Sequence, residues 1–415
     1  MYEYAIIWEW LSFAARWLHV ITAIAWIGSS FYFIALDLSL QKNSALPKDV
    51  HGEEWQVHGG GFYHIQKYLV APAELPKHLT WFKWESYATW ISGFALMCIV
   101  YYAGADLYLI DRNLWDVEPW IAITTSLGSI IISYLIYDLL CKSRLGQKPT
   151  LLMVLLYLIL VLAAWGYTQI FTGRAAFLHL GAITATIMSC NVFIVIIPNQ
   201  KIVVADLINN KTPDPKYGKI AKLRSTHNNY LTLPVIFLML SNHYPLAFGT
   251  EYNWVIASLV FLMGVTIRHY FNSMHARSSN PTWTWAITII IFLVIMWLST
   301  VPKVLDKSFS KMSKHTERFL SSEDFRGVQD VISTRCSMCH AQEPVYSGVY
   351  TAPKKVLLET EKQIARYARD IYLQAGRSNA MPPANVSWME EKAVSYTHLR
   401  AHETRGNLVC RLLLE

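Results

Sequence analysis

The sequence predicts an all-α protein, in which a polytopic membrane bundle of about eight transmembrane helices (residues 1–301) precedes a small C-terminal domain. Of the 415 residues, 53% are hydrophobic and only 16% are charged, whereas a soluble domain has about a quarter charged residues. Apolar runs of membrane length fill residues 11–301, and charge concentrates after residue 302. The 16 Trp and 23 Tyr residues are typical of the aromatic belts at membrane surfaces.

Eight segments have the roughly 20 mostly apolar residues that a membrane-spanning helix needs. They are 11–37, 82–104, 119–140, 150–172, 176–199, 229–248, 252–271 and 283–301. The first is predicted to be a span and not a cleaved signal peptide, because Glu3 and Glu9 precede it and no basic region leads it. Pro234 interrupts the sixth, which a helix facing a bundle interior tolerates.

Loop charge predicts the orientation of the bundle. The odd-numbered loops and their edges hold sixteen Lys and Arg residues, whereas the even-numbered loops hold only Arg112 and Arg174. By the positive-inside rule the odd loops are cytoplasmic, so both termini and the C-terminal domain are predicted to be periplasmic in a bacterial inner membrane. The net charge of +7 is therefore a topology signal, and we expect membrane lipid and no nucleic acid as a partner.

The C-terminal domain carries the motif Cys336-Ser337-Met338-Cys339-His340, which matches the C-x-x-C-H attachment sequence of c-type haem. Two thiols add to the two haem vinyl groups, and the adjacent His340 is the predicted proximal ligand of the iron. A zinc site would need two further ligands at matching spacing, and a redox C-x-x-C pair has no need of the histidine. The motif therefore predicts covalent haem c in a c-type cytochrome domain, and a role in electron transfer.

A second axial ligand to the haem iron is expected downstream of the motif. Met381 lies in a small polar loop before two prolines, and Met/His ligation raises the reduction potential of a haem. Met389 and Met338 are the rival thioethers. Pro353 is predicted to set a turn whose carbonyl orients the His340 ring.

Ionisable residues in or beside the spans predict two polar layers, because such groups are costly within a membrane. The outer layer contains His19, His179 and His243, with Arg16 one turn from His19, and a pair of these histidines, His19 with His179 first, is the candidate for ligating a haem b. The inner layer offers catalytic candidates that suit an anionic, planar substrate. These candidates are His64, Arg224, His227, Arg268 and His269, with His58 and His275 nearby. An ordinary interfacial role explains each of these residues as well.

Several unusual segments of the chain resemble the bacterial membrane-bound, cytochrome-c-containing urate oxidases (urate hydroxylases). The resemblance covers roughly residues 1–393. The segments are Arg16 to Val20, Ala25 to Gly28, His58 to His64 with its glycine triplet, Leu79 to Glu85, Ser225 to Tyr230, and Cys336 to His340 followed by Met381-Pro382-Pro383.

The resemblance implies an oxidoreductase of purine catabolism that oxidises urate to 5-hydroxyisourate. It further implies that the electrons pass to the covalent c-haem and on to an acceptor of the respiratory chain. It gives no set of catalytic residues. If the haem only accepts electrons, the added oxygen atom comes from water.

The resemblance ends at about residue 393, so the C-terminal part of the chain is predicted to consist of three segments. We expect a linker at 302–325 and a cytochrome domain at 326–393. The tail at 394–415 resembles translated sequencing adaptor and does not convincingly supply the last helix of such a cytochrome. The cytochrome domain is therefore predicted to be truncated.

Two other functions remain open at this point. A non-catalytic membrane haem protein would relay electrons from quinol to the c-haem, and it predicts paired histidines deep in two spans. A transporter with a redox sensor predicts broken helices at the membrane midplane and internal repeats, which the sequence lacks. Gly59-Gly60-Gly61 is expected to form a turn and not a phosphate-binding loop, because it lacks the strand-to-helix context and the lysine.

Overall fold

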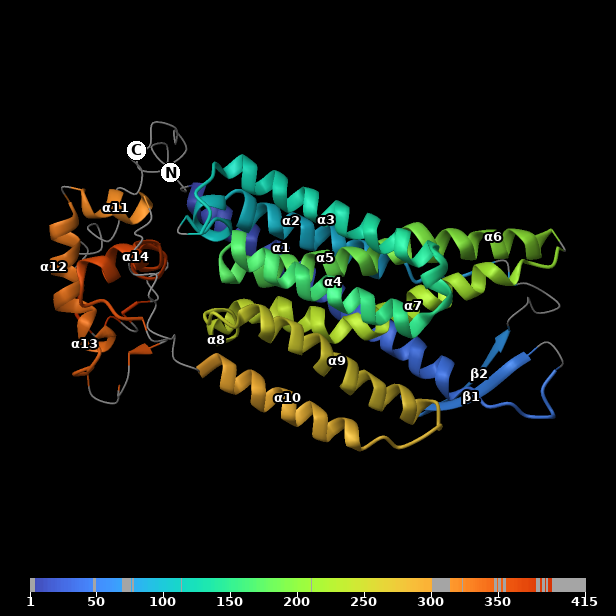
Figure 1. The fold of residues 1–415 in the computed structure, drawn as a ribbon. Helices are drawn as coiled ribbons and strands as arrows, with labels where there is room; N and C mark the ends of the chain where they lie inside the picture. The colour runs from blue at the N-terminus through green and yellow to red at the C-terminus, as the bar shows by residue number, and fades with distance from the viewer. Residues whose placement is uncertain are drawn as a thin grey trace.

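The computed structural model is mostly helical (Figure 1). It describes residues 4–389 with gaps at 48–49, 69–75, 77, 113, 210, 301–313, 323, 347–348, 350–351, 354–355, 378–380, 383–384 and 386. The tail predicted at 394–415 and most of the linker predicted at 302–325 lie outside the described residues.

Among the described residues, six helical segments are long and apolar enough to cross a membrane. They are α1 (Tyr4–Ser39), α3 (Pro119–Lys142), α4 (Pro149–Ile170), α5 (Gly173–Cys190) continuing into α6 (Ile197–Ile208), α9 (Asn253–His275) and α10 (Trp283–Thr300). Helices α3 and α4 each begin with a proline, which the first turn accepts because its N–H groups have no partner within the helix. These segments are consistent with a membrane protein, and the count of eight spans stays a prediction.

The two other predicted spans lie in the same bundle as helices α2 (Trp84–Met97) and α7 (Pro215–Leu240). Helix α2 packs along α1, and α7 packs between α5 and α9. Helix α7 begins well before the predicted span at 229–248, because its polar first half is helical as well. The polar segment around Arg224, expected to precede a span, is therefore inside a bundle helix.

A β-hairpin, which the sequence analysis did not predict, accompanies the helices. Strands β1 (Val50–His58) and β2 (Gly61–Tyr68) pair antiparallel, with His58 opposite Gly61. The two residues between them, Gly59 and Gly60, have φ angles of +58° and +81°, which glycine adopts without a steric cost. The glycine triplet therefore forms the predicted turn, as the tight connection of a hairpin.

The hairpin marks one end of the bundle, and the C-terminal domain marks the other (Figure 1). Tyr32 of α1 donates a hydrogen bond to Gln56 at 2.8 Å, and Arg277 after α9 lies 3.6 Å from Glu54. We call this the hairpin end. The first turns of α1 lie at the opposite end with the C-terminal domain, which we call the C-domain end.

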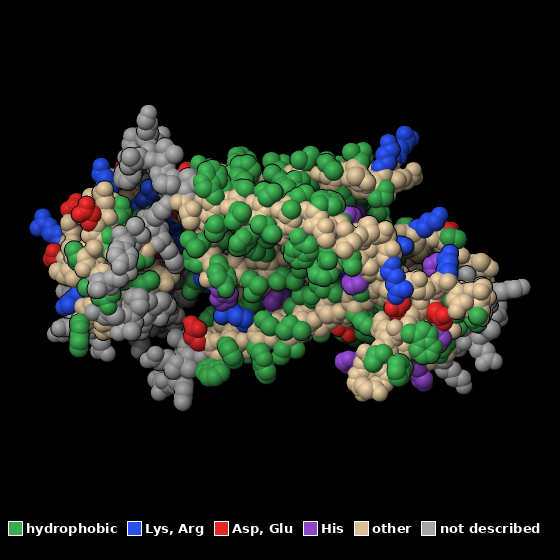
Figure 2. Space-filling model, turned by 90° about the horizontal axis from the view of Figure 1, so that it is seen from below, with side chains coloured by type: hydrophobic (Ala, Val, Ile, Leu, Met, Phe, Trp, Pro, Cys, Tyr) green, Lys and Arg blue, Asp and Glu red, His purple; other side chains and the backbone are tan. Residues whose placement is uncertain are grey.

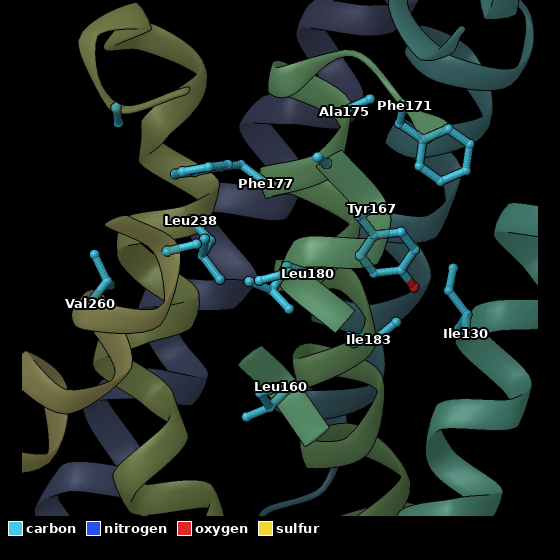
Figure 3. Packing of buried hydrophobic residues seen from close by; sticks show 14 of the residues in the cluster. Ile130, Leu160, Tyr167, Phe171, Ala175, Phe177, Leu180, Ile183, Leu238 and Val260 are labelled. Atoms are coloured by element: carbon cyan, nitrogen blue, oxygen red, sulfur yellow. The ribbon is translucent and has the colours of Figure 1, made fainter. Parts of the chain in front are cut away.

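The hydrophobic core of the bundle surrounds α5, which contacts α3, α4 and α7 (Figure 3). Phe177, Leu180 and Ile183 of α5 are almost fully buried among side chains such as Tyr167 and Leu238. The outer surface of the bundle is apolar too. In Figure 2 hydrophobic side chains cover the middle of the visible face, and most charged side chains lie toward the two ends. Such a distribution suits a bundle whose middle is surrounded by lipid.

The C-terminal domain has a core of its own. It contains α11 (Lys314–Leu320), α12 (Phe325–Arg335), α13 (Ser337–His340) and α14 (Glu361–Ile371). Its buried residues include Phe325, Val328, Ile332, Leu358 and Ile364. The predicted haem motif forms the junction of α12 with α13.

Candidate functional site

A buried polar cluster lies at the hairpin end of the bundle. Arg224 of α7 is only 2% exposed, and its guanidinium donates to Asp138 of α3 at 2.6 Å and to Asn191 at 3.2 Å. Asp138 also binds Lys142 at 2.6 Å. A buried ion pair is tolerated when further hydrogen bonds satisfy its remaining donors and acceptors, as they do here. The hairpin-side cluster consists of Tyr137, Asp138, Asn191, Arg224, His227 and Asn228.

Tyr137 joins the ion pair to a histidine. Its hydroxyl accepts a hydrogen bond from Asn191 Nδ2 and lies 2.8 Å from His227 Nδ1. The hydroxyl hydrogen is then available for Nδ1, which assigns the proton of the neutral ring to Nε2. His227 Nε2 is buried and has no hydrogen-bond partner among the described residues. His227 therefore has one nitrogen fixed by the protein and one nitrogen open.

Asn191 makes hydrogen bonds to three members of this cluster, and it lies where α5 gives way to a π-helical turn. Besides Tyr137, its amide group donates to Asn228 at 2.9 Å and accepts from Arg224. A π-helical turn, Asn191–Ile196, begins at this residue and joins α5 to α6. Single π-helical turns inside α-helices are frequent at functional sites. Here the turn begins at an amide that contacts α3 and α7 together.

A second polar group adjoins the cluster on another side of α7. Arg268 of α9 donates to Asn229 at 3.3 Å and to Asn272 at 3.0 Å, and its guanidinium lies 4.1 Å from the centre of the Phe31 ring of α1. Asn272 donates to Asn229 as well. The Nδ2 of Asn229 has no partner among the described residues. The neighbouring residues Asn228 and Asn229 thus face different helices.

The hairpin half of the bundle concentrates buried polar atoms without a hydrogen-bond partner in the described part of the chain. Buried polar atoms nearly always have a partner, so each exception calls for an explanation. Besides His227 and Asn229, the unpaired atoms are the hydroxyls of Tyr134 and Ser189, one oxygen of Glu85, and Nδ1 of His275. Such atoms can hold a polar ligand and exchange protons with it.

Two of the predicted inner candidates lie apart from this cluster. His64 belongs to β2, where it stacks on Trp55 and binds Glu53 at 2.6 Å. His269 turns toward Trp283 of α10, with 6.1 Å between ring centroids.

The remaining inner candidates lie within the bundle. Arg224 and His227, one turn apart on α7, both contact side chains of α3. Arg268 of α9 lies nearby, because its hydrogen-bond partner Asn229 belongs to α7, the helix that carries Arg224 and His227. The structure therefore joins Arg224 and His227 in one cluster, places Arg268 in the polar group beside it, and leaves His64 and His269 outside.

The predicted outer layer is represented by a second buried cluster at the C-domain end. His179 is fully buried, and its Nδ1 donates to the Ala175 carbonyl at 2.7 Å. Its Nε2 is then an acceptor, 2.6 Å from the hydroxyl of Ser126, which in turn lies 2.8 Å from the hydroxyl of Tyr102. Both nitrogens of His179 are engaged by protein atoms. The C-domain-side cluster consists of Tyr101, Tyr102, Ser126, Arg174, His179 and Asn242.

His19 and His243 are placed differently from His179. His19 Nδ1 lies 3.0 Å from the Thr89 carbonyl, and its ring packs on Gly93, where an added Cβ would lie 2.7 Å from the ring. His243 is exposed in the turn after α7. Coordination of one iron by His19 and His179 would require His179 to give up a protein hydrogen bond, so the haem b site stays a prediction.

The C-terminal motif has the donor set that a c-type haem requires. Cys336 and Cys339 are free thiols, and His340 Nδ1 lies 2.9 Å from the Val356 carbonyl. That hydrogen bond fixes the ring and leaves Nε2 for a metal, as in most metal-binding histidines. Burial, with a smaller effect of Cys339, raises the pKa of the Cys336 thiol to about 11. The residues present therefore fit the predicted group.

The turn that orients His340 begins where the sequence predicted it. The Pro353 carbonyl accepts a hydrogen bond from the Val356 N–H at 3.1 Å, and the Val356 carbonyl in turn contacts the His340 ring. The proline thus acts through the turn, and its own carbonyl does not touch the histidine.

The second axial ligand remains a prediction. Met381 follows α14 and donates its backbone N–H to the Gln374 carbonyl at 2.8 Å, whereas Met389 is 7% exposed in the domain interior. No group of three His, Cys, Asp or Glu residues suitable for a metal ion occurs in the described part of the chain.

The sequence analysis missed most of the residues around Arg224. Tyr137 and Asp138 lie near the end of the third predicted span, and Asn191 lies within the fifth. A carboxylate and an amide inside apolar runs are the signal that would have found them, because polar groups within a membrane require partners.

A comparison with family models places the membrane bundle in a known group. The model described as Urate oxidase N-terminal matches residues 5–299. The match includes both buried clusters and ends within α10, before the C-terminal domain. No curated protein and no solved structure matched the chain.

Proposed function

Because the chain belongs to the urate oxidase N-terminal family, we propose that it oxidises urate to 5-hydroxyisourate at the hairpin-side cluster. The proposal is carried by one observation: His227 Nε2 is a buried ring nitrogen without a partner among the described residues, next to a fixed Arg–Asp pair. The family match supports oxidation of urate, and the assignment of the reaction to this cluster is ours.

The cluster suits the chemistry of urate. Urate is a flat purine that is a monoanion at neutral pH, with carbonyl acceptors and N–H donors around its edge. Among the described residues, His227 Nε2 and Asn229 Nδ2 are buried donors without a partner, and the guanidinium groups of Arg224 and Arg268 are hydrogen-bonded to Asn191 and Asn229. Preorganised donors in a dry site stabilise developing negative charge more strongly than the same groups in water.

The overall reaction determines what these residues must do. The urate monoanion and one water molecule give neutral 5-hydroxyisourate, one proton and two electrons, so the oxygen atom derives from water. His227 is the group placed to exchange a proton with urate or with the attacking water.

Tyr137 allows His227 to exchange protons in both directions. With the Tyr137 hydroxyl donating to Nδ1, the open Nε2 carries the ring proton and can give it to the substrate while Nδ1 takes up the hydroxyl proton of Tyr137. Rotation of the hydroxyl hydrogen away from the ring lets Nδ1 carry the proton instead, and Nε2 is then free to accept one. Asn191 and Arg224 keep Tyr137 in position and do not act on substrate themselves.

The C-terminal segment is proposed to take up the electrons. Cys336 and Cys339 would hold a haem c through thioethers, and His340 would ligate its iron, with Met381 as the second ligand. When bound, such a haem supplies one-electron acceptance, and a two-electron oxidation therefore needs two transfers. The electrons would continue to an acceptor of the respiratory chain.

We further propose that the chain resides in a bacterial inner membrane, with the hairpin end in the cytoplasm. This orientation is supported by the lysine- and arginine-rich loops at that end, which include Lys142, Arg144 and Lys148 between α3 and α4. The C-domain end and both termini would then be periplasmic, where c-type haem is attached. Membrane lipid would cover the apolar outer face.

Electron stoichiometry in the absence of oxygen tests the proposed reaction. Detergent-solubilised full-length chain is given urate and ferricyanide, and urate loss is followed by ultraviolet absorbance. We expect two ferricyanide ions to be reduced per urate consumed, with one oxygen atom from labelled water in the product. No consumption of urate, together with haem reduction by a quinol, would favour the alternative of a non-catalytic electron relay.

A further inference from the structure

The membrane bundle presents a fixed acidic loop at the C-domain end. The loop begins with the π-helical turn Ala105–Leu109 and leads to α3. Leu109 and Ile110 are fully buried, and Ile110 forms a bridge with Phe171. Thr172, between α4 and α5, donates its backbone N–H to the Leu109 carbonyl at 3.1 Å and its hydroxyl to the Tyr108 carbonyl at 2.8 Å. The loop is therefore anchored in the bundle at its base.

The charge of this loop is strongly negative. Between residues 105 and 118 it contains one cation, Arg112, and the carboxylates of Asp106, Asp111, Asp116 and Glu118. Arg112 binds Asp106 at 2.5 Å and Asp116 at 2.7 Å. Burial lowers the pKa of Arg112, but the two carboxylates outweigh this effect and the pKa is raised. We call residues 105–118 the acidic platform.

Helix α14 of the C-terminal domain turns a cation toward this platform. Its apolar face packs into the domain's own core. Arg369, on another face, has Asp370 of its own helix beside it, and Asp111, Tyr108 and Asp106 of the platform are close enough to act on its charge, although burial outweighs these groups and lowers the pKa of Arg369. Its Nε is buried and has no hydrogen-bond partner among the described residues. In Figure 1 α14 lies on the side of the domain next to the bundle, whereas α12 lies on the far side.

We propose that Arg369 docks the C-terminal domain on the acidic platform of the membrane bundle. The partner is the chain's own domain, and the recognition is between a partly desolvated guanidinium and a set of carboxylates. Tyr108 ties the platform to the C-domain-side cluster, because its ring lies 5.7 Å from the Arg174 guanidinium and 6.3 Å from the Tyr101 ring. The docked domain therefore sits over the end of that cluster.

The purpose of the docking rests on the proposed function. Gly173, at the C-domain end of α5, and Asn191 are 18 residues apart, which is about 27 Å at 1.5 Å per residue. Electron transfer weakens steeply with distance, so a domain tethered only by a linker would add a variable gap to this length. Docking through Arg369 keeps the distance between the hairpin-side cluster and the C-terminal domain, which carries the haem motif, at one value.

Zero-length cross-linking tests the docking without urate or haem chemistry. Arg369→Lys keeps the charge and supplies an amine, which a carbodiimide joins to a carboxylate only at ion-pair distance. We expect mass spectrometry of the full-length chain to find a cross-link between α14 and the peptide that contains Asp106 and Asp111. The matched control is Arg326→Lys, on the exposed face of α12. Absence of the platform cross-link at Arg369→Lys, or an equal yield from the control, would overturn the docking.

Charge reversal tests the consequence of docking for electron transfer. Arg369→Glu is expected to lower the docked fraction about tenfold relative to the undocked fraction, the size of a coupling between neighbouring charged residues. Reduction of the haem by urate should slow accordingly, while reduction by dithionite stays unchanged. The double variant Arg369→Glu/Asp111→Lys should restore at least part of the rate. A platform cross-link in a protein that urate does not reduce would leave the docking intact and refute the proposed function.

Discussion

The two buried clusters of the membrane bundle use the same kinds of side chain but satisfy them differently. At the C-domain end the ring nitrogens of His179 are both engaged, by Ala175 and Ser126. At the hairpin end His227 is held only at Nδ1, and its Nε2 has no partner among the described residues. Since unpaired buried polar atoms cost free energy, their retention indicates a use beyond folding. Under the proposed function, the comparison assigns stability to the C-domain-side cluster and chemistry to the hairpin-side cluster.

The largest expected effect comes from replacing His227, with His179 as the matched control. His227→Gln should lower the rate of urate oxidation about 10²- to 10⁴-fold, the usual contribution of a general acid or base. His179→Gln should leave the rate per folded molecule nearly unchanged. Steady-state kinetics on detergent-purified protein, corrected for folded fraction, measures both. Equal losses in the two variants would remove the distinction between the clusters.

The second effect concerns the ion pair that supports His227. Arg224→Met leaves Asp138 with Lys142 as its remaining partner of opposite charge, and breaking a buried pair in this way costs about 3 kcal/mol. Thermal unfolding in detergent should register the loss. Arg112→Met removes two more exposed pairs, with Asp106 and Asp116, and should cost about 1 kcal/mol or less. A loss at Arg224 no larger than that at Arg112 would show that the hairpin-side pair contributes little to stability.

The C-domain-side cluster should respond in stability alone. His179→Ala removes the imidazole that contacts the Ser126 hydroxyl and the Ala175 carbonyl and leaves Ser126 with Tyr102 alone, at a cost of about 1–3 kcal/mol. The expected result is a lower unfolding temperature with normal urate oxidation by the molecules that remain folded. Normal stability combined with lost activity would instead assign chemistry to this end.

The smallest effect on activity is expected outside both clusters. Gly60→Ala places a side chain at a φ of +81°, which costs about 1–2 kcal/mol in the hairpin turn. The described contacts of the hairpin with the bundle are at the ends of α1 and α9. We therefore expect faster proteolysis within residues 50–68 and an unchanged rate of urate oxidation. A strong loss of activity would mean that the hairpin forms part of the catalytic site.

Hydropathy predicted the positions of several helices well, because lipid imposes length and apolarity on each span. Helix α3 was predicted at 119–140 and extends over Pro119–Lys142, and α10 was predicted at 283–301 and ends at Thr300. Helix α7 was predicted poorly. Its first half contains Arg224 and His227, so that the sequence of this segment resembles a loop. The segment is nevertheless a buried helix, because contacts with Asp138 and Asn191 offset the cost of burying Arg224. No local sequence pattern records such contacts.

The hairpin and the site show two further reasons for missed features. The strands β1 and β2 are too short and too polar to register as membrane-length apolar runs, although a Gly-Gly pair between strands is a hairpin signal. For the site, the sequence singled out Arg224 and His227 as ionisable residues near a span. It could not select them over His64 and His269, because the selection depends on which face of each helix meets α3.

The c-haem absorption band provides the most direct test of the central claim that urate is oxidised at the hairpin-side cluster. Full-length protein, His227→Gln and His179→Gln are mixed with urate without oxygen, and the reduced band is followed over time. We predict reduction in the unaltered protein and in His179→Gln, no reduction in His227→Gln, and full reduction of all three by dithionite. Reduction of His227→Gln by urate at the unaltered rate would contradict the account, as would an unaltered protein that only dithionite reduces.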